Sequence, residues 1–381
     1  MLNSCMTTPK VYREMKVKQL NRMKKYCMPT MLVFCLNVSA AEDNTSEADS
    51  LKISGYLESY YIYDTHDPAS DTRPSFAYSH NRVGKPSINL AMIKASFNQP
   101  YIRANLAIGS GTYMRANYAL EPRDLQKLFE ANVGVRLSDT NLWLDAGLLP
   151  SHIGFESAIG LDNWTVTRSM LADNSPYFET GLRLSYTSDD GEWYLSGLLL
   201  NGWQRIQRPD GNTTPAIGHQ ITYKPNAAVT LNSSSFIGND KSDQERKMRY
   251  FHNLYGQLQL SERWGLIAGF DIGAEQAEKN SSRYHVWYTP ILIAKYTYSE
   301  KCSFAVRAEY YQDNNEVIVT TDTPNGFRTF GYSANVDYKL MNNLALRAEL
   351  RKFKSKDEIF EKKSGLSDES LLLTAAAIVY F

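Results

Sequence analysis

The sequence predicts an all-β protein: a transmembrane antiparallel up-and-down β-barrel of about 16 strands, with short periplasmic turns and long extracellular loops. Three observations support this class. Apolar and polar residues alternate along most of the chain, the alternating segments run for about 9–13 residues, and tight turns alternate with long polar loops. Globular strands average about five or six residues, whereas about 9–11 tilted residues cross a bilayer. The patterns together favour a membrane barrel over a soluble sandwich.

The N-terminal region has the layout of an export signal. Lys24 and Lys25 precede an uncharged, largely apolar stretch from Cys27 to Val38, which is too short for a membrane-spanning helix. Val38-Ser39-Ala40 then supplies small residues at the −3 and −1 positions of a cleavage site. We interpret residues 1–40 as the signal peptide region of an exported protein.

The rest of the chain is expected to form a single domain. Translation could start at Met15 or Met23 without losing the signal, residues 41–51 form a short periplasmic segment, and residues 52–381 carry no linker. Removing residues 1–40 leaves 34 basic and 40 acidic residues, which argues against a nucleic-acid partner. Cys302 is then the one remaining cysteine, so no internal disulfide is expected.

Strands are expected wherever one register is apolar and the other polar. The clearest segments are 102–108, 129–137, 264–272, 302–310, 330–338 and 344–350. Residues 371–381 form a last strand ending in Phe381, which resembles the signal that outer-membrane barrels present to their assembly machinery. Turns recur about every 40 residues, as in a propeller, but each period here holds two long strands instead of four short ones.

The connections fall into two alternating classes. Tight polar turns are expected at 98–100, 138–140, 188–191, 225–226, 261–262, 299–300 and 341–342. Long loops are expected near 65–86, 113–127, 150–177, 204–215, 239–248, 275–285, 313–327 and 354–368. Short turns at one end and long loops at the other are typical of outer-membrane barrels.

The strand Cys302–Tyr311 shows which face meets water. Its even positions are apolar or aromatic, whereas Arg307 and Glu309 lie on the other face. A charge facing lipid costs about 2–4 kcal/mol at mid-depth, so we expect these two side chains to point into water inside the barrel. The same parity predicts a pore lined by Arg103, Glu130, Arg136, Asp145, Glu179, Arg183, Asp271, Arg307, Glu309, Asp337, Arg347, Glu349 and Arg351. About sixteen strands leave an aqueous channel.

Aromatic residues gather near both ends of the predicted strands, as expected of two girdles at the membrane–water interfaces. We assign Trp203, Trp264, Tyr298, Tyr310, Tyr338 and Phe381 to these girdles.

Loop 150–177 is the longest predicted loop, and its apolar content is too high for a loop exposed to solvent. We expect it to fold into the barrel and narrow the passage, although packing on the rim is an alternative. The residues expected at this constriction are Glu156, Asp162, Asn163, Trp164 and Arg168.

The same loop carries a resemblance to a known family. Phe155-Glu156-Ser157, Asn163-Trp164, Thr167-Arg168-Ser169, Pro176-Tyr177 and Leu200-Asn201-Gly202-Trp203 resemble the putative beta-barrel porin-2 family, the OmpL-like porins of Gram-negative outer membranes. The resemblance implies a pore for small solutes and no catalysis, and it does not identify the solute.

Two functions remain open. The first is an outer-membrane porin for passive diffusion of small hydrophilic solutes and ions, and the second is a binding or adhesion barrel with a blocked lumen. No cofactor, metal site or enzymatic activity is predicted: the histidines show no metal spacing, and no serine and histidine are recognised together on the lipid face, as a barrel lipase would need. The expected partners are outer-membrane lipid or lipopolysaccharide and the assembly machinery, and the sequence leaves monomer and trimer open.

Overall fold

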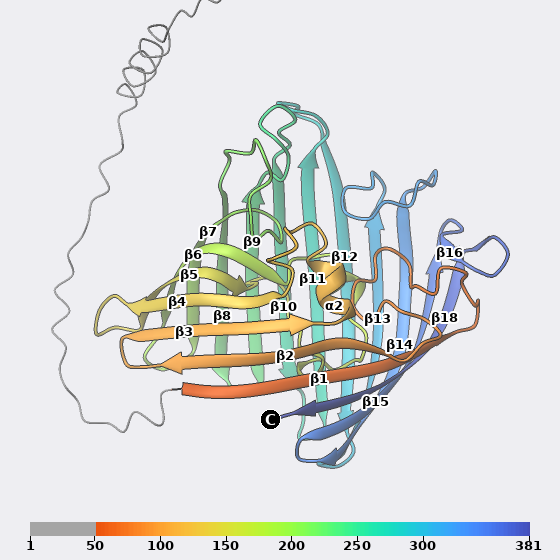
Figure 1. Cartoon of the computed structure of the whole chain (residues 1–381), viewed down its shortest axis with the longest axis horizontal. Coiled ribbons are helices and arrows are strands. Elements are labelled where there is room, and N and C mark those ends of the chain that lie inside the picture. Colours follow the sequence, from red (N-terminus) through yellow and green to blue (C-terminus); the bar gives the residue numbers. More distant parts are fainter. Residues whose placement is uncertain (1–50) are drawn as a thin grey trace, which may run out of the picture. The chain divides into compact units, whose positions relative to one another are not determined.

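The computed structural model describes residues 51–381, and sixteen strands of this part of the chain close into one antiparallel barrel (Figure 1). Each strand pairs with the next in sequence, and β1 closes the ring by pairing with β18. The fold class predicted from the sequence is confirmed. The signal peptide at residues 1–40, the alternative starts at Met15 and Met23 and the segment up to residue 50 lie outside the described residues.

The first eight barrel strands are β1 Leu51–Asp64, β2 Ser87–Asn98, β3 Ile102–Ser110, β4 Leu128–Arg136, β5 Leu142–Pro150, β6 Phe178–Thr187, β7 Trp193–Leu200 and β8 Ala216–Asn226. The other eight are β9 Val229–Gly238, β10 Arg249–Gln259, β11 Trp264–Gln276, β12 Tyr284–Thr297, β13 Cys302–Asp313, β14 Phe327–Met341, β15 Leu344–Ser355 and β18 Glu369–Tyr380. Short elements lie in the loops: helix α2 Thr112–Asn117, the 3-10 turn η2 Gly160–Asp162, helix α3 Met170–Asp173 and the hairpin β16 Phe360–Glu361 with β17 Leu366–Ser367.

Alternation along each strand separates an apolar outer face from a polar inner face. On β13, Phe304 and Val306 are exposed on the outside, whereas Arg307 and Glu309 are buried on the inside. β15 repeats the pattern, with Leu346 and Leu350 exposed and Arg347 and Glu349 buried. This is the polarity expected when lipid surrounds the barrel, because a charged side chain facing hydrocarbon would be destabilising. The backbone N–H and C=O groups are satisfied separately, by pairing within the closed sheet.

The wall of the barrel is not uniform in height. Strands β3 to β7 contain 8–10 residues each, whereas β11 to β15 contain 12–15. We call β3–β7 the short wall.

No helix within residues 51–381 has the length and hydropathy needed to cross a membrane.

The two ends of the barrel domain are joined at the seam between β1 and β18. The backbone of Phe381 exchanges hydrogen bonds of 3.0 and 3.1 Å with Gly55. The aromatic ring of Phe381 covers Gly55 so closely that a Cβ atom there would lie 2.3 Å from the ring. Glycine at position 55 is therefore needed for the terminal aromatic residue to pack on the first strand.

Most of the predicted girdle residues lie on the outer surface. Trp264, Tyr298, Tyr338 and Phe381 are exposed at the end that carries the tight turns, and Tyr310 packs against Phe330 near the long loops. Trp203 does not belong to a girdle. It follows the end of β7 and a turn at Gly202, and it packs edge-on against the inward-facing rings of Phe236 and Phe251 at 5.1 and 4.8 Å.

The lipid-facing position of Val306 can be tested by introducing a charge. Val306→Arg should lower the free energy of unfolding by about 2–4 kcal/mol in lipid vesicles, because a guanidinium would be placed in hydrocarbon. Glu300→Arg, at an exposed position of the tight turn before β13, should leave that free energy within about 0.5 kcal/mol of wild type. Equal unfolding curves for the two variants would contradict the assigned polarity.

Candidate pore and constriction loop

Charged side chains on β2 to β6 line one side of the barrel interior. Asp145 on β5 accepts hydrogen bonds of 2.7 and 2.6 Å from Arg103 on β3. The guanidinium of Arg183 on β6 lies 3.2 Å from the same carboxylate. Lys94 on β2 lies 2.6 Å from Glu130 on β4. The two arginines and Lys94 remain partly exposed, so this side of the interior keeps polar groups accessible.

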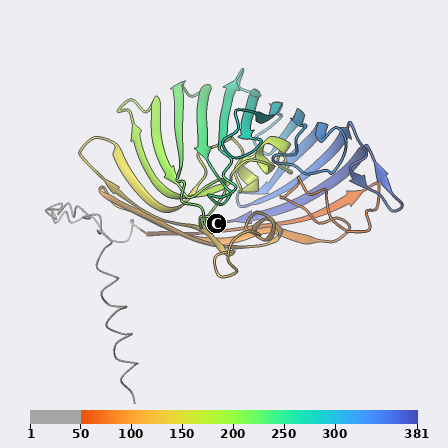
Figure 2. The same cartoon turned by 90° about the horizontal axis from the view of Figure 1, so that it is seen from above.

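Loop 150–177 leaves the barrel wall at β5 and crosses the interior, where Figure 2 shows its helical segment between opposite walls. Its first turn is anchored by His152, whose Nδ1 lies 2.7 Å from Glu179 and whose Nε2 lies 2.8 Å from the Ser235 carbonyl oxygen. The backbone N–H of Gly154 donates to the Asn253 side chain at 3.3 Å. The loop is therefore fixed to β6, β9 and β10 soon after it begins.

The second half of the loop is held by carboxylates on the opposite wall. Glu349 on β15 accepts hydrogen bonds from the backbone N–H and the hydroxyl of Thr167, at 2.6 and 2.7 Å. Glu309 on β13 accepts one from the backbone N–H of Met170 at 2.6 Å. All four residues are buried, and charged acceptors make these bonds about twice as strong as neutral ones.

Two arginines of the same wall, on β13 and β15, also donate to the second half of the loop. Arg307 donates to the Thr167 carbonyl oxygen at 2.8 Å and pairs with Glu349 at 2.7 Å, and Arg351 donates to the Arg168 carbonyl oxygen at 2.6 Å and pairs with Glu309. We call Arg307, Glu309, Glu349 and Arg351 the clamp.

The clamp corrects one expectation from the sequence. Arg307 and Glu309 point inward, but loop 150–177 covers them, so they are buried instead of facing water. The same holds for Glu349 and Arg351. Arg347 is likewise covered, since it donates to the carbonyl oxygens of Gly160 and Asn163 while pairing with Asp337.

Three other residues predicted to line the pore bond to neighbouring protein groups. Asp271 is buried against Asn253, and Glu179 is buried against His152. Arg136 lies at the tight-turn end of β4, where its guanidinium donates to the carbonyl oxygens of Asp139 and Thr140.

The residues predicted at the constriction take different roles. Arg168 is fully buried and donates to the carbonyl oxygens of Ser157, Val166 and Ala158, so it holds the loop together internally. Asn163 holds the same turn through Ser157 and Ile159. Glu156 caps the turn at Ser169 by accepting from its backbone N–H at 3.0 Å.

The other two residues predicted at the constriction are Asp162 and Trp164. Asp162 is exposed, and the ring of Trp164 lies under the ammonium of Lys295 at 5.6 Å.

A second loop, 65–86, also enters the barrel, which the sequence reading missed. Phe76 packs against Phe327, Phe353 and Phe360 with ring centroids 4.7, 5.6 and 6.3 Å apart. The hydroxyl of Ser79 donates to Asp173 in loop 150–177 at 3.0 Å. The run Phe76-Ala77-Tyr78 inside a polar loop was the available signal, because such apolar residues need burial.

Two cavities remain beside loop 150–177. The wall cavity, about 340 Å³, lies between the loop and β2–β4 and includes Lys94 and Glu130 in its lining. The turn-side cavity, about 520 Å³, includes Glu192, Lys224 and Tyr255. Gly154 and Phe155 line both cavities, so the Phe155 ring stands where the two cavities meet.

The outer face carries a polar row that the sequence reading did not recognise. The backbone ladder aligns His219 on β8, Ser235 on β9 and His252 on β10. His219 Nδ1 lies 2.5 Å from the Ser235 hydroxyl, and the imidazole centroids are 5.9 Å apart. This corrects the expectation that no serine and histidine lie together on the lipid face. Within residues 51–381, the hydrogen bond of the His219 ring is to the Ser235 hydroxyl, and neither a carboxylate nor an amide side chain bonds to it.

A closed barrel with an apolar outer face, a charged interior and an infolded loop defines a porin-type barrel of the bacterial outer membrane. The chain belongs to the family described as Putative beta-barrel porin-2, OmpL-like, which matches residues 50–381. The resemblance found in the sequence is thereby confirmed. No curated protein matches the chain.

Solved structures show the same fold at low sequence identity. The outer membrane channel DcaP of Acinetobacter baumannii has a TM-score of 0.59 at 12% identity, over 88% of this chain and 99% of the other. The anion-selective porin from Comamonas acidovorans has a TM-score of 0.59 at 11% identity, over 87% and 99%. The trimer form of in-vitro folded OmpT of Vibrio cholerae has a TM-score of 0.56 at 9% identity, over 87% and 99%.

The clamp can be tested with a substitution that removes a charge and keeps the shape of the side chain. Glu349→Gln removes the charge that Thr167 and Arg307 share, so it should lower the free energy of unfolding by about 3 kcal/mol. Asp368→Asn is the matched control, because its pair with Lys354 is exposed to solvent and should contribute less than about 1 kcal/mol. Urea titration in vesicles measures both, and a Glu349→Gln effect no larger than the control would refute the clamp.

Proposed function

We propose that this protein is a passive diffusion channel of the outer membrane for small hydrophilic solutes and ions. Family membership supports a channel, and the two cavities that meet at Phe155 are the observation that carries the proposal. The passage runs from the wall cavity beside β2–β4, past loop 150–177, to the turn-side cavity beside β6–β10. No catalytic step, cofactor or metal is part of this proposal.

We take the ring of Phe155 as the gate of the proposed passage, because Phe155 lines both cavities. It rests on Gly269 of β11, where a Cβ atom would lie 2.8 Å from the ring, and it meets Tyr255 edge-on at 5.6 Å. The Phe155 side chain is held by these ring contacts, whereas the second half of the loop is held by hydrogen bonds to the charged clamp. A rotation of this ring would enlarge the opening without moving the backbone of the loop.

The accessible charges favour anions. Arg103 and Arg183 share the single carboxylate of Asp145, and Lys295 lies over Trp164 on the other side of the loop. The Lys94–Glu130 pair is balanced, and the exposed carboxylate of Asp162 offsets one of the positive charges. A positive excess along a narrow aqueous passage attracts anions and repels cations. One structural neighbour is an anion-selective porin, but the proposed preference here rests on the charges of this chain.

The blocked-lumen alternative rests on a specific observation. Loop 65–86 and loop 356–368 bring Phe76 and Phe360 against Phe327 and Phe353, which fills part of the interior with aromatic side chains. A barrel closed by this cluster would serve as a surface binding protein. The conductance of the purified chain distinguishes the two functions.

Export and assembly complete the proposal. Cleavage near Ala40 would release the mature chain to the periplasm, and the strand that ends in Phe381 would be presented to the barrel assembly machinery. Self-association is compatible with the trimer form of one structural neighbour.

The proposed passage predicts measurable currents in planar lipid bilayers. Wild-type protein should give open-channel currents, and Phe155→Ala should raise the unitary conductance severalfold by joining the two cavities. Phe304→Ala, which removes a lipid-facing ring on β13, should leave the conductance unchanged. A silent wild-type protein would favour the binding protein, and a conductance unaffected by Phe155→Ala would place the passage elsewhere.

The proposed anion preference predicts a shift in reversal potential across a salt gradient. Arg103→Gln and Arg183→Gln should each move the reversal potential toward cation preference, while the other arginine still neutralises Asp145. Arg263→Gln, in the exposed turn before β11, serves as the control. If the two single variants and the control shift equally, these arginines do not set the selectivity.

A further inference from the structure

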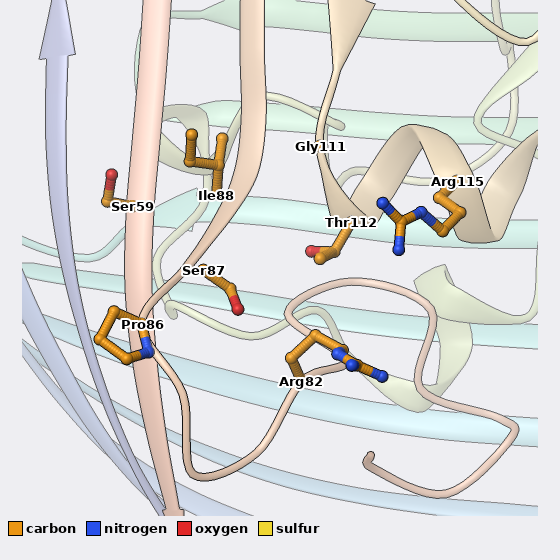
Figure 3. Close-up of a pocket in the computed structure, with 8 residues that line it drawn as sticks. All are labelled: Ser59, Arg82, Pro86, Ser87, Ile88, Gly111, Thr112 and Arg115. Carbon is orange, nitrogen blue, oxygen red and sulfur yellow. The ribbon is translucent and has the colours of Figure 1, made fainter. Parts of the chain in front are cut away.

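A polar pocket of about 500 Å³ lies on the barrel at the loop end of β1 and β2 (Figure 3). Its lining comes from three segments: the end of loop 65–86 with Arg82 and Pro86, the strands with Ser59, Ser87 and Ile88, and the start of α2 with Gly111, Thr112 and Arg115. We infer that this pocket binds the phosphate group of an outer-leaflet lipid headgroup, such as that of lipopolysaccharide.

The pocket lies in the barrel wall, at the edge that β2 presents beyond the end of β3. Ser59 and Ile88 are exposed, whereas their neighbours Glu58 and Asn89 are buried and bonded to each other at 2.8 Å inside. Tyr61, two residues after Ser59 on β1, is also exposed on the outer face. The pocket is therefore reached from the side on which lipid surrounds the barrel, at the level where an aromatic girdle is expected.

The pocket exists because the short wall begins here. β3 pairs with β2 only as far as Ala91↔Ser110, so residues 87–90 of β2 have no strand partner on that side. The chain turns at Gly111, where φ is 133° and a Cβ atom would lie 2.3 Å from the Asn89 carbonyl oxygen. Only glycine fits this turn, after which α2 forms the side of the pocket that faces β2.

Hydrogen bonds fix the walls of the pocket. The Tyr60 hydroxyl accepts from the backbone N–H of Arg82 at 3.0 Å and contacts the hydroxyl of Thr112 at 3.1 Å. The backbone N–H of Gly84 donates to the Ile62 carbonyl oxygen at 2.8 Å. The segment that carries Arg82 is thereby held to β1, and the site does not have to form on binding.

The charge of the pocket selects an anion. Within residues 51–381, neither the Arg82 nor the Arg115 guanidinium makes a hydrogen bond or ion pair with the protein. Asp71, a nearby carboxylate, is paired with Lys85. Two guanidiniums with the hydroxyls of Ser59, Ser87 and Thr112 provide donors suited to a tetrahedral phosphate, which arginine binds through paired N–H groups.

A lipid headgroup fits better than free phosphate for two reasons. The cavity is larger than one phosphate requires, and small-molecule sites of about 300–1,000 Å³ typically enclose a whole ligand. Exposed Ile88 and Tyr61 beside the opening offer apolar and aromatic contacts to the rest of a lipid. The inference does not depend on the proposed channel function, because the pocket shares no lining residue with the two interior cavities.

The test compares lipid binding by purified full-length variants in detergent, measured by native mass spectrometry. Lipopolysaccharide should bind wild type, and R82Q and R115Q should each weaken binding at least fivefold, with R82K and R115K restoring part of it. R283Q, an exposed arginine on the loop between β11 and β12, should bind as wild type. Heat-modifiable migration on gels checks that every variant is folded.

Two further probes separate the sources of phosphate. Dephosphorylated lipopolysaccharide should bind wild type as weakly as the double variant R82Q/R115Q binds the intact lipid, which would support recognition of a lipid phosphate. Inorganic phosphate that binds wild type alone, at millimolar concentration and with no lipid bound, would overturn the lipid inference in favour of a free-anion site. Equal binding of intact lipid by wild type and the double variant would overturn the site altogether.

Discussion

Pairing of backbone polar groups within hydrocarbon is the constraint on which the rest of this structure depends. A strand in lipid has no water to satisfy its N–H and C=O groups, so the sheet must close, and β1 meets β18 for that reason. Closure assigns every second side chain to the interior. The interior of a sixteen-strand ring is too wide for wall side chains to fill, so the remaining space is available to loops.

Loop 150–177 occupies that space by exchanging hydrogen bonds with charges on the wall. Burying Arg307, Glu309, Glu349 and Arg351 would be costly if any of them were left unpaired. Here the carboxylates accept from backbone N–H groups of the loop and the guanidiniums donate to its carbonyl oxygens. The irregular backbone of the loop and the buried charges of the wall therefore satisfy each other, and the cavities left in the interior lie beside β2–β4 and β6–β10.

Sequence patterns predicted the strands and turns because alternation has a fixed period and directly reports the environment of each face. They also identified the infolding of loop 150–177 from its apolar content. They did not reveal that Arg307 and Glu309 are covered, since parity tells on which face a side chain lies but not what packs against it. The contact of His219 with Ser235 depends on the register between two strands, which the alternation within a single strand does not specify. The contact of Phe76 with Phe353 depends on the path of loop 65–86, which alternation does not describe at all.

The clamp also has a consequence for the order in which the protein matures. Residues 150–177 lie between β5 and β6, yet their docking partners lie on β13 and β15. The loop can therefore dock only after both of these strands have joined the sheet. Until then the interior of the barrel is wider, and docking of the loop is the step that fills it.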